Sequence, residues 1–242
     1  MVRITAFTLC VVASWWCVAQ TTFQEQAARL QNINAYLLDF RPAAAPEVRE
    51  KISLEFVLDL AVQPSVDTRV GNKDEDIDPP GVVPKLRGRL HFQQGFMIGG
   101  AFAPGIEFQG YEADFVAAEL GWRKQMNDFT IGVRGSWIDG EILGPVTEPE
   151  LDDLFVFENY AGDVSLAWSW TPTWTVYGFA GFVTTETSLD VALDGVHLDN
   201  DDDAFYGGAG VQWRNKKWRA VLEQNFTASY LNNVIASLSY SF

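Results

Sequence analysis

The C-terminal segment alternates strictly between two kinds of side chain, and this alternation constrains the fold more than any other feature of the chain. One set is apolar and the other is mostly serine: Val234, Ala236, Leu238, Tyr240 and Phe242 against Ile235, Ser237, Ser239 and Ser241. A period of two places successive side chains on opposite faces of a β-strand. Similar alternation recurs from residue 52 onward. After residue 19 no apolar run approaches the ~18 residues of a transmembrane helix, so the sequence predicts strands.

The alternation predicts ten strands, each near the ~9–11 residues that a tilted strand needs to cross a bilayer. They cover residues 52–62, 85–92, 96–103, 112–122, 129–138, 159–170, 174–184, 204–214, 218–228 and 233–242. The gaps 93–95, 123–128, 171–173 and 215–217 are short, whereas 63–84, 139–158 and 185–203 are long. Short periplasmic turns at one end and longer loops at the other are typical of a transmembrane barrel. We expect an all-β, antiparallel up-and-down barrel of about ten strands, with eight as the alternative, in an outer membrane with both termini periplasmic.

Aromatic side chains gather beside the short gaps, where an interfacial girdle would lie. They are Phe92, Phe96, Trp122, Trp168, Trp170, Trp174, Trp213 and Trp218. A looser upper girdle is expected from Tyr111, Trp137, Tyr160 and Tyr230. The pattern therefore predicts that the apolar strand faces meet lipid.

The opposite strand faces then fill the lumen with charged side chains. These are Glu55, Asp59, Arg87, Arg89, His91, Glu119, Arg134, Asp163, Arg214, Arg219 and Glu223. Charges in a narrow lumen are tolerable only when paired and hydrogen-bonded. We therefore expect Glu55 and Asp59 to face Arg87 and Arg89. Glu223 and Arg219 should lie close by if the barrel closes through the ninth, tenth and first strands.

The N-terminal residues form two segments ahead of the barrel, which spans 52–242. Residues 1–19 read as a secretory signal peptide cut before Gln20, with an apolar core after Arg3 and small residues at Cys17-Val18-Ala19. Both cysteines lie within it, so the mature chain has no thiol for a disulfide or metal cluster. Residues 20–51 are expected to be periplasmic. The capping-box pair Thr22 and Glu25 favours a short periplasmic or barrel-docked helix over Thr22 to Phe40, and a flexible extension is the alternative.

The charge is strongly negative and unevenly distributed. Without residues 1–19 the chain carries 16 basic and 32 acidic residues, a formal charge of −16, which argues against a nucleic-acid partner. The four expected outer loops, 63–84, 104–111, 139–158 and 185–203, hold 20 acidic residues and two basic ones, Arg69 and Lys73. Such a mouth would attract cations.

Motifs for chemistry are weak, and we assign no catalytic, cofactor-binding or metal site. His91 is expected to make a buried polar contact in the lumen, and His197 lies in an acidic loop with Asp194 and Asp199. The run Asp199 to Asp203 resembles the start of a calcium loop. It has Ala204 and Gly210 where an EF-hand loop needs glycine and glutamate. Residues Gly207, Gly208 and Gly210 are interpreted as close-packing positions in a strand.

The terminal strand carries the family resemblance. Its alternation ending in Phe242 resembles the small outer-membrane barrels of Gram-negative bacteria, of the OmpA-transmembrane-domain and opacity-protein type. The resemblance implies lipid and lipopolysaccharide around the barrel, and recognition of the Phe242 strand by the barrel assembly machinery. The best-known members have eight strands.

Three classes of function follow. We favour a structural or surface-interaction barrel with a side-chain-packed lumen. The alternatives are a narrow, cation-preferring porin-like channel and a surface-facing enzyme, either a protease or lipid-modifying. Omptin-type proteases are ten-stranded and use His and Asp at the outer rim, but no matching motif is present, so we expect no enzyme.

Overall fold

The computed structural model of the chain describes residues 23–62, 82–108, 110–147, 151–192, 195–228 and 231–242. Their elements in chain order are α2 (Phe23–Leu38), β1 (Ser53–Val62), β2 (Val82–His91), η1 (Gln93–Gly95), β3 (Phe96–Phe108), β4 (Tyr111–Met126), β5 (Phe129–Gly144), β6 (Asp153–Ser169), β7 (Trp174–Val191), β8 (Val196–Asn215), β9 (Trp218–Thr227) and β10 (Leu231–Ser241). The expected signal peptide lies outside the described residues.

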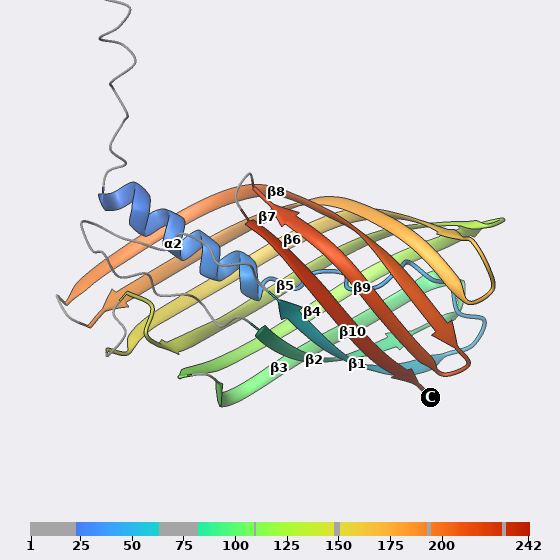
Figure 1. The fold of residues 1–242 in the computed structure, drawn as a ribbon, viewed down its shortest axis with the longest axis horizontal. Helices are drawn as coiled ribbons and strands as arrows, with labels where there is room; N and C mark the ends of the chain where they lie inside the picture. Colours follow the sequence, from blue (N-terminus) through green and yellow to red (C-terminus); the bar gives the residue numbers. More distant parts are fainter. Residues whose placement is uncertain (1–22, 63–81, 109, 148–150, 193–194, 229–230) are drawn as a thin grey trace, which may run out of the picture.

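Ten antiparallel strands close into one barrel, as the sequence predicts (Figure 1). Each strand pairs with its neighbours in sequence, and β1 pairs with β10 to complete the ring. Phe56 opposes Tyr240 across that seam, and β10 pairs in turn with β9. The predicted closure through the ninth, tenth and first strands is confirmed. Closure leaves no unpaired sheet edge, which is what a strand protein in lipid requires.

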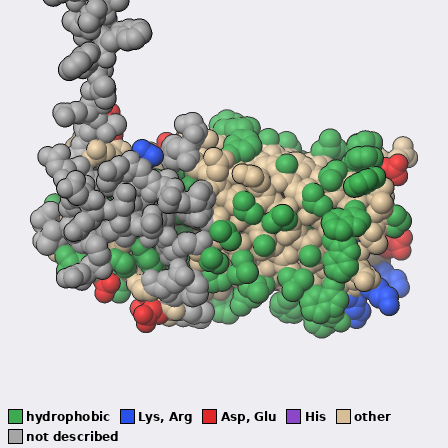
Figure 2. All heavy atoms as spheres, viewed as in Figure 1, with side chains coloured by type: hydrophobic (Ala, Val, Ile, Leu, Met, Phe, Trp, Pro, Cys, Tyr) green, Lys and Arg blue, Asp and Glu red, His purple; other side chains and the backbone are tan. Residues whose placement is uncertain are grey.

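The outer surface of the barrel carries a belt of exposed apolar side chains (Figure 2). On β8 the outward row runs from Trp213 through Val211 to Phe205, and the next outward residue is Asp203. The row covers about nine residues, which matches one crossing of a bilayer by a tilted strand. Among the described residues no helix is long and apolar enough to cross a membrane.

Four strands continue well beyond this belt, and here two expected loops are wrong. Strands β5, β6, β7 and β8 have 16, 17, 18 and 20 residues. A strand of 20 residues is about 66 Å long at ~3.3 Å per residue, more than one crossing needs. The predicted loops 139–158 and 185–203 are therefore mostly strand, and the acidic run Asp199 to Asp203 lies within β8. The predicted gaps 104–111 and 123–128 are also shorter than expected, because β3 extends to Phe108 and β4 spans Tyr111–Met126.

The N-terminal segment lies inside the barrel, which corrects its expected place. Helix α2 sits within the end of the barrel from which β7 and β8 project, and residues 39–52 run through the lumen to the short-turn end (Figure 1). Along this path Ile33, Phe40 and Ala43 are fully buried. The predicted helix does form, and of its two predicted places the structure shows the barrel-docked one. The start of α2 and the C-terminus lie at opposite ends of the barrel (Figure 1). The expectation that both termini are periplasmic stays a prediction, because residues 1–22 lie outside the described chain.

The short turns and the glycines explain how the strands approach one another closely. Gly95 has φ +88°, and a Cβ there would collide with the carbonyl oxygen of Arg123, so the β2–β3 turn requires glycine. A Cβ on Gly210 would lie 2.7 Å from the ring of Tyr177, and one on Gly208 would lie 2.7 Å from Phe179. The interpretation of these strand glycines as close-packing positions is confirmed.

Candidate functional site

The lumen is organised around a ladder of cationic side chains on β2. Alternate residues of this strand point inward, which places Lys85, Arg87 and Arg89 in one buried row. Each of the three donates hydrogen bonds to backbone carbonyl oxygens of the N-terminal segment. We call residues 39–52, together with helix α2, the plug segment, because they occupy the lumen along its length.

The contacts of the ladder follow the plug segment from the end of the helix inward. The Nζ of Lys85 lies 3.2, 2.6 and 2.7 Å from the carbonyl oxygens of residues 37, 38 and 39. The Nη1 of Arg87 lies 2.8 Å from the carbonyl oxygen of Arg41, and the Nη2 of Arg89 lies 2.6 Å from that of Pro42. Because carbonyls at a helix C-terminus lack intrahelical donors, Lys85 supplies the missing partner at the end of α2.

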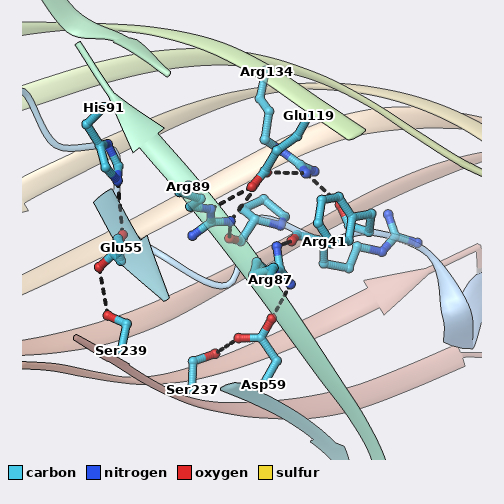
Figure 3. A network of polar contacts seen from close by, with 12 residues as sticks. Arg41, Glu55, Asp59, Arg87, Arg89, His91, Glu119, Arg134, Ser237 and Ser239 are labelled. Atoms are coloured by element: carbon cyan, nitrogen blue, oxygen red, sulfur yellow. Dashed lines mark hydrogen bonds and ion pairs between the residues drawn. The ribbon is translucent and has the colours of Figure 1, made fainter. Parts of the chain in front are cut away.

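Acidic side chains from the barrel wall complete the network (Figure 3). The Nε of Arg89 lies 2.6 Å from Oε1 of Glu119, and Arg134 bridges Glu119 at 3.3 Å to Asp163 at 2.6 Å. The Nη1 of Arg134 also donates to the carbonyl oxygen of Phe40, at 2.5 Å. Each of these charges is therefore paired with an opposite charge, as burial in a narrow interior requires.

A second cluster gathers on Glu55 near the short-turn end of the lumen. Its Oε2 lies 2.9 Å from Nη2 of Arg219 and 3.0 Å from Nε2 of His91, and its Oε1 accepts a hydrogen bond of 2.7 Å from Ser239. The Nδ1 of His91 lies 3.0 Å from Nη1 of Arg123. The prediction that His91 makes a buried polar contact is confirmed.

The expected lumen pairs are confirmed in part. Asp59 forms an ion pair with Arg87 on the adjacent strand, as predicted. In contrast, Arg89 pairs with Glu119, and Glu55 pairs with Arg219 across the β1–β10–β9 seam. The strand register does place Glu55 opposite Arg89, as predicted. At ion-pair distance, however, Glu55 meets Arg219 of β9 and Arg89 meets Glu119 of β4.

The plug segment supplies its own charged groups to the wall, which sequence reasoning missed. Arg41 forms an ion pair with Asp39 at 3.0 Å, donates to Oγ1 of Thr227 at 2.7 Å and stacks on the ring of Tyr206. At the other end Glu47 forms an ion pair with Arg214. These contacts join the segment to β8 and β9, on the side of the lumen across from β2.

At the end of the barrel away from the short turns, helix α2 is held by uncharged and acidic side chains of β7 and β8. Gln31 accepts a hydrogen bond from Thr187 on β7 at 2.9 Å. Asn32 and Tyr36 both donate to Oδ2 of Asp202 on β8, at 2.9 and 2.6 Å. The helix thus packs against β6, β7 and β8. The inward-facing member of the acidic run serves to dock the helix rather than to hold a cation.

The second histidine lies outside the membrane-spanning part of β8. Its Nδ1 lies 2.6 Å from Oδ1 of Asp190, and its Nε2 lies 3.0 Å from Oδ1 of Asp199. The hydrogen bond to Asp190 and the negative charge of Asp199 raise the pKa of His197. Because both ring nitrogens already face carboxylates, His197 presents no free nitrogen to a substrate in this arrangement.

No cluster of three or more His, Cys, Asp or Glu side chains in the described ranges is arranged to hold a metal ion. Asp199, Asp201 and Asp203 point outward from β8 and are exposed, whereas Asp202 points inward to the helix. Alternation along a strand therefore separates the acidic residues that a calcium loop would bring together. The run Asp199 to Asp203 is therefore similar to a calcium loop in sequence only.

No protein-family model and no curated protein matches the chain. Similar solved structures include Ail, the attachment invasion locus protein of Yersinia pestis, solved with a heparin analogue, at 12% identity over 79% of this chain and 99% of that one (TM-score 0.35). The KdgM porin, solved with oligogalacturonate, matches at 12% identity over 78% and 99% (TM-score 0.35). The transport unit of the autotransporter AIDA-I from Escherichia coli matches at 10% identity over 91% and 99% (TM-score 0.37).

At 10–12% identity and TM-scores of 0.35 to 0.37, these structures are similar to the chain in fold alone. The closed ring of strands and the exposed apolar belt of this chain are independent of that likeness. An outward apolar belt above short turns is what an outer-membrane barrel presents to lipid. The chain is therefore an integral outer-membrane β-barrel.

Proposed function

We propose that this barrel is closed by its own plug segment and serves a structural or surface-interaction role, not that of an open pore. The observation that carries the proposal is the β2 ladder. Three cationic side chains of one strand bind the carbonyls of residues 37–42. A segment bound in this way stays in the lumen.

The energetics favour a permanent occupant. Lys85, Arg87 and Arg89 are each no more than 5% exposed. Withdrawing the segment would leave three buried cations without the carbonyls that complete their coordination, and an unsatisfied buried charge is strongly destabilising. The segment and the barrel wall therefore stabilise each other, and opening would require water to replace every lost contact.

The direction of the barrel in the membrane follows from its ends. The short-turn end carries Arg123, Lys124, Lys216 and Lys217 beside the exposed tryptophans, and the other end carries the acidic strand extensions. Short turns are periplasmic in outer-membrane barrels, so the acidic end and the start of α2 face outward in this proposal. The C-terminus is then periplasmic, where Phe242 is available to the barrel assembly machinery. Lipid and lipopolysaccharide surround the belt.

A cation-preferring channel is the second candidate, and the acidic outer end favours it. Exposed Asp199, Asp201 and Asp203 would concentrate cations near the mouth within a Debye length of about 8 Å at physiological salt. Conduction would further require residues 39–52 to leave the lumen. An enzyme has less support, because both ring nitrogens of His197 already face the carboxylates of Asp190 and Asp199.

Planar-bilayer recording on refolded protein tests the proposal. The wild-type protein should be silent, because the plug segment fills the lumen. A variant lacking residues 23–50 should conduct and should prefer cations. Lys124→Met, which changes an exposed residue near the short-turn end of β4, is the control that should stay silent. Stable cation-selective openings from the wild-type protein would overturn the proposal in favour of the channel.

A further inference from the structure

An apolar cavity of about 120 Å³ lies between helix α2 and the barrel wall. The helix contributes Asn34, Leu37 and Leu38, and the wall contributes residues of β2 to β6 and the β5–β6 connection. Its position follows from the docking of the helix. Hydrogen bonds draw α2 toward β7 and β8, which leaves space on the side of β2 to β5.

The lining of the cavity is unusual for a barrel interior, which is normally polar. On β4 the inward-facing Ala113 and Phe115 line it, and Ile142 and Phe155 line it from β5 and β6. An unfilled apolar cavity destabilises a protein, because its lining loses packing contacts. An apolar lining offers water no hydrogen-bond partners, so an apolar occupant would displace water from the space at little cost.

Polar groups at the cavity are already engaged within the protein. The side-chain amide of Asn34 donates to the carbonyl oxygen of Leu30 at 3.1 Å, and the hydroxyl of Tyr111 donates to that of Pro145 at 3.0 Å. Each side chain therefore has one donor fewer to offer a polar ligand, which would also lose its own hydration on entering an apolar lining. The lining therefore favours a ligand without hydrogen-bonding groups.

Charge near the cavity further restricts the ligand. The β4 residues Glu112 and Asp114 are exposed, as are Asp139 and Glu141 on β5, which is paired with it. Negative charge at this end raises the local concentration of cations and lowers that of anions. An anionic molecule would be repelled from the end of the barrel where the cavity lies.

We propose that this cavity is a binding site for one small, uncharged, apolar molecule of about the size of a single six-membered ring. An engineered cavity of about 150 Å³ lined by similar side chains binds benzene, so the volume is of the right order. The inference goes beyond the closed-lumen proposal and rests on it in one respect, because helix α2, which forms one wall of the cavity, is part of the plug segment. A wild-type protein that is silent in the bilayer but binds no fluorobenzene would refute the cavity site alone.

A matched pair of fluorinated probes tests the site by ¹⁹F NMR on the refolded protein in lipid bicelles. Fluorobenzene should give a protein-bound resonance with magnetisation transfer to aromatic side chains of the cavity. The probe 4-fluorobenzoate, the same ring with one negative charge, should give none. Partition of fluorobenzene into lipid is equal in all samples, so a comparison of variants isolates the site.

The variants differ only in which face of β4 receives a larger side chain. Ala113→Leu fills the cavity and should abolish the bound resonance, together with the rise in thermal unfolding temperature that fluorobenzene gives the wild type. Ala118→Leu places the same side chain on the lipid-facing side and should keep both effects. If Ala113→Leu fails to fold, Val83→Phe takes its place. A bound resonance that survives filling of the cavity, or none in the wild type, would overturn the proposal.

Discussion

Replacing Arg89 by methionine is the most direct test of the packed lumen. Methionine keeps most of the apolar stem and removes the guanidinium, so the change isolates the charge and its hydrogen bonds. Arg89 is 1% exposed, and it holds Glu119 at 2.6 Å and the carbonyl oxygen of Pro42 at 2.6 Å. The variant therefore leaves one buried carboxylate and one buried carbonyl short of a partner.

The expected loss of stability can be worked from these contacts. Removing one partner of a buried ion pair costs about 3–5 kcal/mol, and a carbonyl left without its donor costs about 1–3 kcal/mol. Arg134 still lies 3.3 Å from Glu119 and keeps part of the neutralisation. We therefore expect the unfolding free energy to fall by about 4 kcal/mol, near the lower end of the combined cost.

Urea unfolding in detergent, followed by the electrophoretic shift between folded and unfolded forms, measures this loss. With a denaturant slope of about 2 kcal/mol per molar, the midpoint of Arg89→Met should fall by about 2 M. Lys124→Met changes an exposed residue near the short-turn end of β4 and should stay within about 0.5 kcal/mol of wild type. Adding Glu119→Gln to Arg89→Met removes the orphaned charge and should restore part of the stability. Equal midpoints for Arg89→Met and Lys124→Met would mean that the lumen is hydrated, and the reasoning would fail.

Three further outcomes are expected. In Gly210→Val the new side chain would meet the ring of Tyr177, so the unfolding free energy should fall by about 1–3 kcal/mol. The outward-facing Ala209→Val is the control and should be tolerated. Equal stability of the two variants would contradict the packing argument. Cysteine at the exposed position 24 should react with a membrane-impermeant maleimide on intact cells, and cysteine at position 216 only after permeabilisation; the reverse pattern would invert the proposed orientation. Asp190→Asn should lower the NMR-measured pKa of His197, which Asp190 and Asp199 raise. Since the folded-state pKa is raised, the charged ring's stabilising contacts are fully present below the unfolded value of about 6.5, and they weaken as pH rises through the folded value. An unchanged pKa in Asp190→Asn would refute that account.

The strand pattern was predictable because alternation is a local property of the sequence. The expected strands 52–62 and 218–228 agree with β1 and β9 to within one residue at each end. The strands β5 to β8 were underestimated for a physical reason. Above the belt their outward residues, such as Thr184, Glu186 and Asp203, meet water, so a polar composition resembles that of a loop. Strand pairing needs only backbone hydrogen bonds, and these continue wherever neighbouring strands extend together.

The course of the plug segment was not predictable from charge pairing alone. The alternation of Lys85, Arg87 and Arg89 indicates a buried cationic row, and acidic partners are the natural expectation. A backbone carbonyl has no side-chain signature, so a segment that binds through its carbonyls leaves no complementary charge pattern to recognise. Two of these cations, Arg87 and Arg89, form ion pairs with the wall residues Asp59 and Glu119. For Lys85 the contacts are three carbonyl oxygens.

The composition of the plug segment suits this form of binding and is the signal that could have found it. Between Arg41 and Pro46 the chain reads Arg-Pro-Ala-Ala-Ala-Pro, and the three alanines are 0%, 7% and 1% exposed. Small side chains let a backbone pass through a narrow, side-chain-lined lumen. Each proline lacks an N–H group, so it adds an acceptor to the lumen without a donor that needs a partner. The Pro-Ala segment ahead of β1 is therefore rich in hydrogen-bond acceptors. The inward-facing row of Lys and Arg on β2 is rich in donors, so the two complement each other.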